Sequence, residues 1–231
     1  MNTNLQNVFG ASGEALVNTR HRVLRNTYWL LALSMIPTIL GAWLGVQMNF
    51  SFFAGNPFVG FMVFMAIAFG FFYAIEKTKN SGLGVAVLLG FTFFMGLLLS
   101  RLIGHTLGYS NGASLIMIAF GGTAAVFTAM ASIATVSKRD FSGLGKWLFA
   151  GVIVILLASV ANIFLHLPAL YLVVSVMAIA IFSAYILFDV QRVINGGETN
   201  YISATLSIYL DVYNIFVNLL SLLGIFGGSR D

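Results

Sequence analysis

Residues 82–100 read GLGVAVLLGFTFFMGLLLS, without one charged side chain. The apolar positions follow one another continuously and do not alternate with polar ones. A stretch of this kind approaches the ~20 residues that a helix needs to cross ~30 Å of hydrocarbon. Because the bilayer core holds no water to pair with backbone groups, a chain that crosses it must bond internally, as a helix does. The stretch therefore predicts a transmembrane helix, and the missing alternation argues against a barrel strand.

Six further apolar runs follow the same pattern, at residues 27–48, 57–75, 112–136, 147–165, 168–188 and 204–224. The whole chain of 231 residues is 59% hydrophobic and 8% charged, whereas a soluble domain carries roughly 25% charged residues. We therefore expect an all-α integral membrane protein: a polar tail at 1–26, a seven-helix transmembrane bundle at 27–226 and a short C-terminal tail at 227–231. Because Asp211 interrupts the last run, one alternative stays open. In this alternative, the chain crosses the membrane six times and ends in a re-entrant segment.

The positive charges predict the orientation of this bundle. If all seven runs cross the membrane, nine Lys and Arg residues fall on the side of the N-terminus, and Arg101 and Arg230 fall on the other. Loops rich in Lys and Arg stay in the cytoplasm, so we expect a cytoplasmic N-terminus. The net charge of +4 is then explained by topology, and the expected partner is the lipid bilayer and not nucleic acid. The nine residues are Arg20, Arg22, Arg25, Lys77, Lys79, Lys138, Arg139, Lys146 and Arg192.

Two acids fall within or next to the predicted spans. Asp189 follows the sixth run directly, and Asp211 lies about seven residues inside the seventh. The short turn between the two runs makes them antiparallel neighbours, so the two carboxyl groups are expected to meet. A carboxylate at that depth costs several kcal/mol unless it is protonated, paired or hydrated, and two neighbouring carboxyl groups titrate as one coupled unit. The pair is a candidate pH sensor that attracts Ca²⁺ when deprotonated; the alternative for Asp189 is a local ion pair with Arg192.

A polar stripe continues from Asp211 along the seventh helix. Its members are spaced by four, three, four and three residues, which places them on one face of a helix. The stripe either bonds to neighbouring helices or lines a hydrated path to the acids, and packing is the slightly favoured interpretation. Gly41 and Gly45 match a close-packing motif of membrane helices, for which internal packing is favoured over a dimer contact. The stripe consists of Ser207, Asp211, Asn214, Asn218 and Ser221.

Motifs of enzymes are missing. The sequence has no Gly-x-Ser-x-Gly elbow and no phosphate-binding glycine loop, and its three histidines fit no metal-ligand spacing. The absence of cysteine excludes disulfides, iron–sulfur clusters and thiolate catalysis. Intramembrane aspartyl proteases also carry two membrane aspartates, but their Gly-x-Gly-Asp motif is replaced here by Ile208-Tyr209-Leu210 before Asp211. We expect neither catalysis nor a cofactor.

The segments around the two acids resemble a known family. They read ILFD at 186–189, GGETNYI at 196–202 and LSIYLD at 206–211, and they closely resemble the signature of the Bax inhibitor family. The segments VLRNTY at 23–28 and ANIFLHLPAL at 161–170 are similar to its bacterial YccA branch. The resemblance runs from about residue 20 to the end of the chain and is most specific in the last part.

The resemblance implies a bacterial inner-membrane protein with a seven-helix bundle and a central last helix. The YccA branch modulates the membrane protease FtsH and behaves as a substrate that resists extraction. In other members the aspartates that match Asp189 and Asp211 form a pH-sensitive pair that gates a calcium leak, with a basic cluster after the second helix as a latch. Here that place holds Lys77 and Lys79, so any latch is built from lysine, and Arg192 is a further candidate. The resemblance leaves FtsH modulation and a cation leak (Ca²⁺ or H⁺) both open.

Overall fold

The computed structural model describes residues 3–50 and 56–229, with side chains from Thr19 onward. Seven helices in this part are long and apolar enough to cross a membrane. The prediction of seven long apolar helices is therefore confirmed. The last of them continues unbroken through Asp211 for 27 residues, so Asp211 does not interrupt the helix as the re-entrant alternative supposed. The helices are α1 (Thr3–Gln47), α2 (Pro57–Thr78), α3 (Gly82–Leu107), α4 (Gly112–Val136), α5 (Leu144–Leu165), α6 (Pro168–Ile194) and α7 (Tyr201–Gly227).

Asparagine and proline define several helix starts. The side chain of Asn56 accepts hydrogen bonds from the backbone of Phe58 and Val59 at the start of α2, and Asn200 does the same for Ile202 and Ser203 in α7. An N-cap of this kind satisfies backbone N–H groups that have no partner inside the helix. Pro57 and Pro168 occupy first helical positions, where the missing N–H costs nothing.

Several helices extend beyond the apolar runs that predicted them. α6 continues to Ile194, so Asp189 lies more than one turn inside the helix and does not end it. α7 begins at Tyr201, three residues before the predicted start, which places Asp211 ten residues into the helix, or about 15 Å along its axis. These boundaries were wrong because backbone hydrogen bonding continues into polar residues, where the hydropathy signal has already ended.

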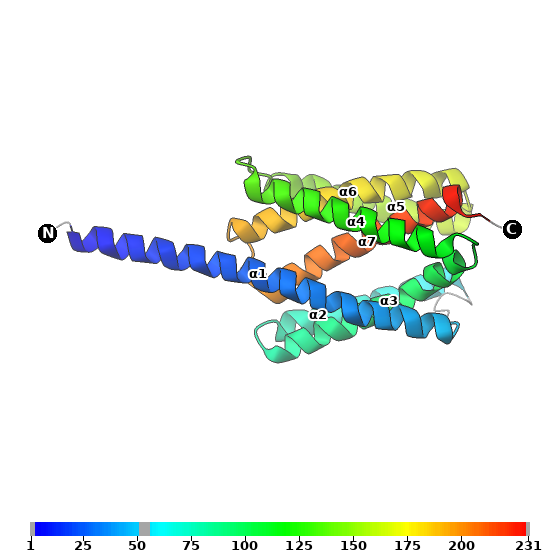
Figure 1. Ribbon diagram of the computed structural model, residues 1–231, viewed down its shortest axis with the longest axis horizontal. Helices are drawn as coiled ribbons and strands as arrows, with labels where there is room; N and C mark the ends of the chain where they lie inside the picture. Colours follow the sequence, from blue (N-terminus) through cyan, green and yellow to red (C-terminus); the bar gives the residue numbers. More distant parts are fainter. Residues whose placement is uncertain (1–2, 51–55, 230–231) are drawn as a thin grey trace.

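α1 joins the predicted N-terminal tail to the first span. The helix is continuous from Thr3 to Gln47, and its membrane-crossing part is Thr19–Gln47. Figure 1 shows its N-terminal part projecting well beyond the other helices. Residues 1–2 of the tail, like residues 230–231 at the other end, lie outside the described part.

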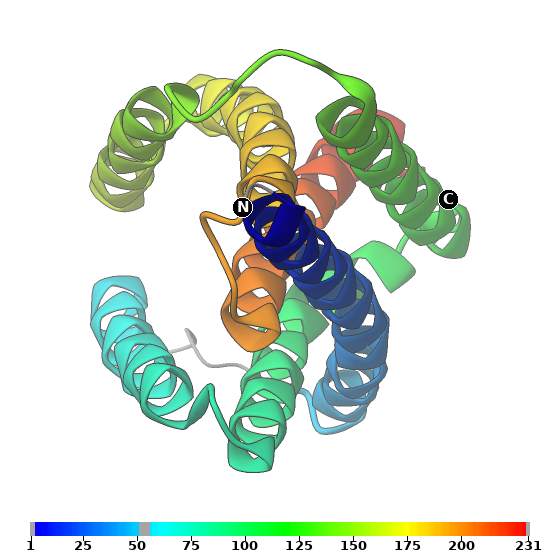
Figure 2. The ribbon, with the colours of Figure 1, turned by 90° about the vertical axis from the view of Figure 1, so that its left-hand side faces the viewer.

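α7 lies at the centre of the bundle. It contacts α1, α2, α3, α4 and α6, and Figure 2 shows α1, α2 and α3 on one side of it and α4, α5 and α6 on the other. Ile202, Ile208 and Ile215 on α7 are fully buried in the core. The two groups of three helices are thus held together chiefly by the helix that carries Asp211.

α1 and α3 make the closest helix pair. A Cβ atom added to Gly41 would collide with the carbonyl oxygen of Phe93, and one added to Gly96 would collide with that of Thr38. Gly45 approaches Ser100 in the same way. Small residues let membrane helices approach this closely, so the preferred interpretation of the Gly41 and Gly45 motif, packing inside the bundle, is confirmed.

A hydroxyl cluster ties the same two helices to α7. Oγ1 of Thr38 lies 2.9 Å from the phenol oxygen of Tyr209. The single O–H of Thr38 also lies within hydrogen-bond distance of the backbone carbonyls of Ser34, at 2.9 Å, and Thr92, at 3.2 Å. These groups are buried. A buried polar group must be hydrogen-bonded to be tolerated in an apolar core, and this cluster meets that condition.

Candidate functional site

Asp189 and Asp211 face each other across the α6–α7 contact. Their side chains are 8% and 4% exposed, and the two carboxyl groups are close enough to share a hydrogen bond. The helices are joined by the turn at residues 195–200, in which Gly196 has φ 79°. Glycine tolerates this left-handed conformation without steric cost, so the turn reverses the chain tightly and brings the two acids together.

A hydrogen bond between two carboxyl groups requires a proton on one of them. Oδ2 of Asp211 is buried and has no hydrogen-bond partner among the described residues. Leaving a buried polar group without a partner costs about 1–3 kcal/mol. This oxygen can therefore accept a hydrogen bond from a proton donor such as water.

Two further residues belong to the surroundings of the pair. The phenol of Tyr185, one turn before Asp189 on α6, lies within electrostatic range of both carboxyl groups. The carboxylate of Glu198 acts on Asp189 from the α6–α7 turn. Sequence reasoning missed Tyr185, although its spacing of four residues from Asp189 places the two on one face of a helix.

Each basic residue proposed as a latch interacts with a side chain other than Asp189 or Asp211. Lys79 pairs with Glu76, Lys77 sits 5.5 Å from the centre of the Tyr73 ring, and Nη2 of Arg192 lies 3.6 Å from Oε2 of Glu198. The charge of Arg192 still acts on Asp189 at longer range. Within the part of the chain described, neither acid forms a salt bridge with Lys or Arg. The predicted latch residues therefore do not contact the acid pair in this structure.

The amides of the polar stripe bond along their own helix. Nδ2 of Asn214 donates to the carbonyl oxygen of Leu210 at 2.8 Å, and Nδ2 of Asn218 donates to that of Asn214 at 2.8 Å. Ser221 is buried and Ser207 is half-buried. Donation of this kind to the preceding turn satisfies an amide without a neighbouring helix, so these two donors are not the helix-to-helix bonds that the packing interpretation expected.

Comparison with known proteins adds a second line of evidence. Residues 20–228 match the family described as Bax1-I, inhibitor of apoptosis-promoting Bax1. The chain belongs to the Bax inhibitor family. The match covers every residue of the site, and it confirms the resemblance that the segments around the two acids indicated.

Relatives of this Bax inhibitor family protein occur in several bacteria. The Modulator of FtsH protease YccA of Escherichia coli K12 is 41% identical over 211 residues, which cover 91% of this chain and 92% of that protein. An uncharacterized protein of Neisseria meningitidis serogroup B is 39% identical over 89% of this chain and 91% of its own length. An uncharacterized membrane protein of Vibrio cholerae is 35% identical over 90% of this chain and 92% of its own. The similarity therefore extends over nearly the whole bundle.

The only metal ligands predicted at this site are the carboxyl groups of Asp189 and Asp211. Among the described residues, no three His, Cys, Asp or Glu side chains come together as a metal site. Ca²⁺ takes 6–8 oxygen ligands, so Asp189 and Asp211 would supply part of a shell that water completes. Transient Ca²⁺ binding by the two carboxyl groups remains a prediction.

Proposed function

We propose that this protein is a multi-pass protein of the bacterial inner membrane that modulates the protease FtsH. The observation that carries the proposal is the continuity of α1, which runs without a break from a projecting N-terminal part into the most closely packed helix pair of the bundle. The similarity along the whole chain to a protein named as a modulator of FtsH supports it. The protein then acts by binding and not by catalysis.

The mechanism follows from how a protease of this type handles membrane substrates. FtsH is expected to engage the N-terminal tail, for which the positive charges predict a cytoplasmic position. To proceed, it must pull α1 away from α3 and α7. That step breaks the contacts at Gly41 and Gly96 and strips Thr38 of the phenol of Tyr209. A substrate that is gripped but not extracted occupies the protease and slows the turnover of other substrates.

The test compares the full chain with a variant that lacks residues 2–18. Each is overexpressed, and the half-life of another membrane substrate of FtsH is measured. The full chain is expected to lengthen that half-life, and the truncated chain, still inserted, is expected not to. A variant that lacks residues 230–231 at the opposite end, and so keeps the hydrogen bonds of Ser229 to Ser110 and Asn111, is the control. If the truncated chain inhibits as strongly as the full one, the tail is not the part that FtsH engages.

A second candidate function, a pH-gated cation leak, is favoured by one observation. Oδ2 of Asp211 is buried beside Asp189 and has no hydrogen-bond partner in the described part of the chain. It lies on the helix that contacts both halves of the bundle. Two carboxyl groups that share a proton titrate as a unit. A change in their charge would alter the α6–α7 contact, and the polar side chains farther along α7 would line the path.

Flux of Ca²⁺ into proteoliposomes, measured from about pH 6 to about pH 8, tests this candidate, because a coupled pair of carboxyl groups changes its charge with pH. The wild type is expected to show flux that depends on pH, and Asp189→Asn/Asp211→Asn is expected to lose that dependence. Asp140→Asn, which removes an exposed acid from the α4–α5 loop, is the control and should behave as wild type. Flux no higher than that of empty liposomes at any pH would rule the leak out and leave FtsH modulation standing.

A further inference from the structure

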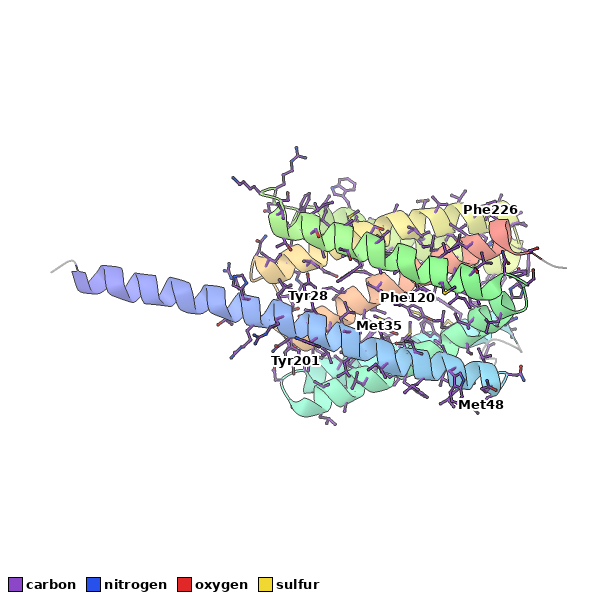
Figure 3. The ribbon with its side chains drawn as sticks, in the orientation of Figure 1. Tyr28, Met35, Met48, Phe120, Tyr201 and Phe226 are labelled. Atoms are coloured by element: carbon purple, nitrogen blue, oxygen red, sulfur yellow. The ribbon has the colours of Figure 1, made fainter. Side chains whose placement is uncertain are left out.

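An apolar groove opens at the side of the bundle between α1 and α4. Its volume is about 320 Å³, at the lower end of the roughly 300–1,000 Å³ of small-ligand pockets. Ala32 and Met35 of α1 form one wall, Phe120 and Ala124 of α4 form the other, and α7 forms the floor with Val212 and Phe216. Figure 3 shows Met35 and Phe120 along the gap between the two helices.

The groove exists because α1 and α4 do not pack directly on each other over the residues described. Both helices pack on α7 instead, and side chains bridge the space between them. At the end nearer the N-terminus, the rings of Tyr28 and Phe127 meet edge to face with their centroids 5.9 Å apart. The groove is thus closed at that end by two aromatic rings, below which it opens sideways toward the membrane.

A basic pocket lies directly beyond this aromatic closure. It is lined by His21, Arg22, Leu24, Arg25 and Tyr28, so Tyr28 belongs both to the pocket and to the groove. Arg22 and Arg25 are exposed, and an arginine side chain keeps its charge at any physiological pH. Within the range whose side chains are described, no acid forms a salt bridge with either arginine.

The pocket and the groove share one face of α1. His21, Arg25, Tyr28, Ala32, Met35 and Ile39 line one or the other, and they follow one another at intervals of four and three residues, the period of a single helix face. The stretch from Tyr28 to Ile39 is about 16 Å long at the rise of an α-helix. That length is about half of the ~30 Å hydrocarbon thickness, so the apolar part of this face matches a single leaflet.

We propose that this face of α1 binds one anionic phospholipid of the surrounding leaflet. The phosphate lies on Arg22 and Arg25, Tyr28 sits at the level of the glycerol backbone, and one acyl chain fills the groove down to Ile39. An apolar crevice in hydrocarbon loses contacts if it stays empty. The lining of this groove exposes almost no polar surface to hold water, so a chain from the bilayer fills it. The two arginines select the headgroup, because basic pockets at the cytoplasmic ends of membrane helices attract anionic lipids.

The headgroup is tested with the full chain and an equimolar mixture of phosphatidylglycerol and phosphatidylcholine of identical acyl chains. Native mass spectrometry of the protein released from detergent counts the lipids retained. Wild type is expected to retain phosphatidylglycerol preferentially. Each arginine contributes a preference of about fivefold, so Arg22→Gln/Arg25→Gln is expected to lower the preference by about 25-fold. Lys138→Gln/Lys146→Gln removes the same charge from the same end of the bundle, outside the pocket, and is expected to leave the preference unchanged.

The groove is tested separately by filling it. Ala124 and its neighbour Ala125 are both exposed on α4, but Ala124 lines the groove and Ala125 does not. Ala124→Trp is expected to lower the retention of both lipids, whereas Ala125→Trp should retain them as wild type does. Equal retention of the two lipids by wild type, or equal loss in the two tryptophan variants, would overturn the proposal. So would a dimer that Ala124→Trp splits while lipid retention stays unchanged, because the groove would then hold a second copy of the chain.

Discussion

The two parts of α1 differ in how much of the bundle surrounds them. Its N-terminal part projects beyond the other helices, whereas the part from Thr27 to Ala42 is held by α3 and α7, with Thr27, Ser34 and Thr38 buried. One continuous helix therefore joins a projecting end to the most closely packed contact of the molecule. A protein that is easy to grip and hard to extract needs both properties in the same segment, because a pull on one part acts directly on the other.

The largest expected effect comes from breaking the packed part. Gly41→Leu pushes a side chain into the carbonyl of Phe93, and overpacking of this kind costs about 3 kcal/mol. We expect the variant to be extracted and degraded by FtsH, so that its own half-life falls and other substrates are no longer spared. Pulse-chase measurements in cells with and without FtsH check this.

Gly70→Leu is the matched control for that change. A Cβ atom at Gly70 on α2 meets nothing within 4 Å, so the same substitution adds apolar surface without a collision. Its half-life should equal that of wild type. If Gly41→Leu is as stable as Gly70→Leu, the close approach of α1 and α3 does not resist extraction.

A smaller effect is expected from the hydroxyl cluster. Tyr209→Phe removes the phenol oxygen 2.9 Å from Thr38, together with its longer contact of 3.5 Å to the carbonyl of Thr92. The hydroxyl of Thr38 keeps the carbonyl of Ser34 as an acceptor. The loss of one such bond lowers the free energy of unfolding by about 1 kcal/mol. Thermal unfolding in detergent should show a modest drop for Tyr209→Phe and none for Tyr171→Phe, whose side chain is exposed.

A still smaller effect on stability is expected at Asp211, two residues farther along α7. Asp211→Asn offers an amide donor to Asp189 and removes a proton-dependent charge, so the free energy of unfolding should change by no more than about 1 kcal/mol. Resistance to FtsH should remain that of wild type. A loss as large as that of Gly41→Leu would mean that the acid pair holds α6 on α7 and is structural.

The smallest expected effect on stability is at Asp140, in the α4–α5 loop. The backbone N–H of Ser142, and then its hydroxyl, donate to this carboxylate, each at 2.9 Å, and lower its pKa from the usual 3.8. A carboxylate with a lowered pKa stabilises the fold above 3.8, and that contribution is lost as the pH falls through the lowered value. The unfolding midpoint of wild type should exceed that of Asp140→Asn slightly at neutral pH and equal it once Asp140 is protonated. A constant difference at every pH would mean that charge has no part in it.

The residues that were predictable from the sequence are those with a local signal. Pro57, Gly82, Gly112 and Pro168 begin helices where the apolar runs begin, and nearly all of the bundle followed from the runs alone. The pairing of Lys79 with Glu76 and of Lys77 with Tyr73 also has a local signal, since these residues are three or four positions apart on one helix.

Other features depend on how helices cross, which no run of residues reveals. The groove between α1 and α4 arises because both helices pack on α7 and not on each other. The continuation of α6 past Asp189 to Ile194 was hidden by polar residues such as Gln191, whose amide donates to the carbonyl of Arg139 and whose amide oxygen accepts from the backbone of Phe141. A helix can therefore continue through polar residues whose side chains bond to a neighbouring loop, although the hydropathy pattern predicts an earlier end.

Site-specific crosslinking to FtsH tests the difference between the two parts of α1 most directly. A photoreactive phenylalanine analogue replaces Gly10 in the projecting part or Trp43 on the exposed face of the packed part, and purified FtsH is added to the full chain in liposomes with ATP. We predict a crosslink from residue 10, none from residue 43, and little degradation of the chain over the same time. A crosslink from residue 43 and none from residue 10 would contradict engagement through the N-terminal part, and rapid degradation would contradict resistance to extraction.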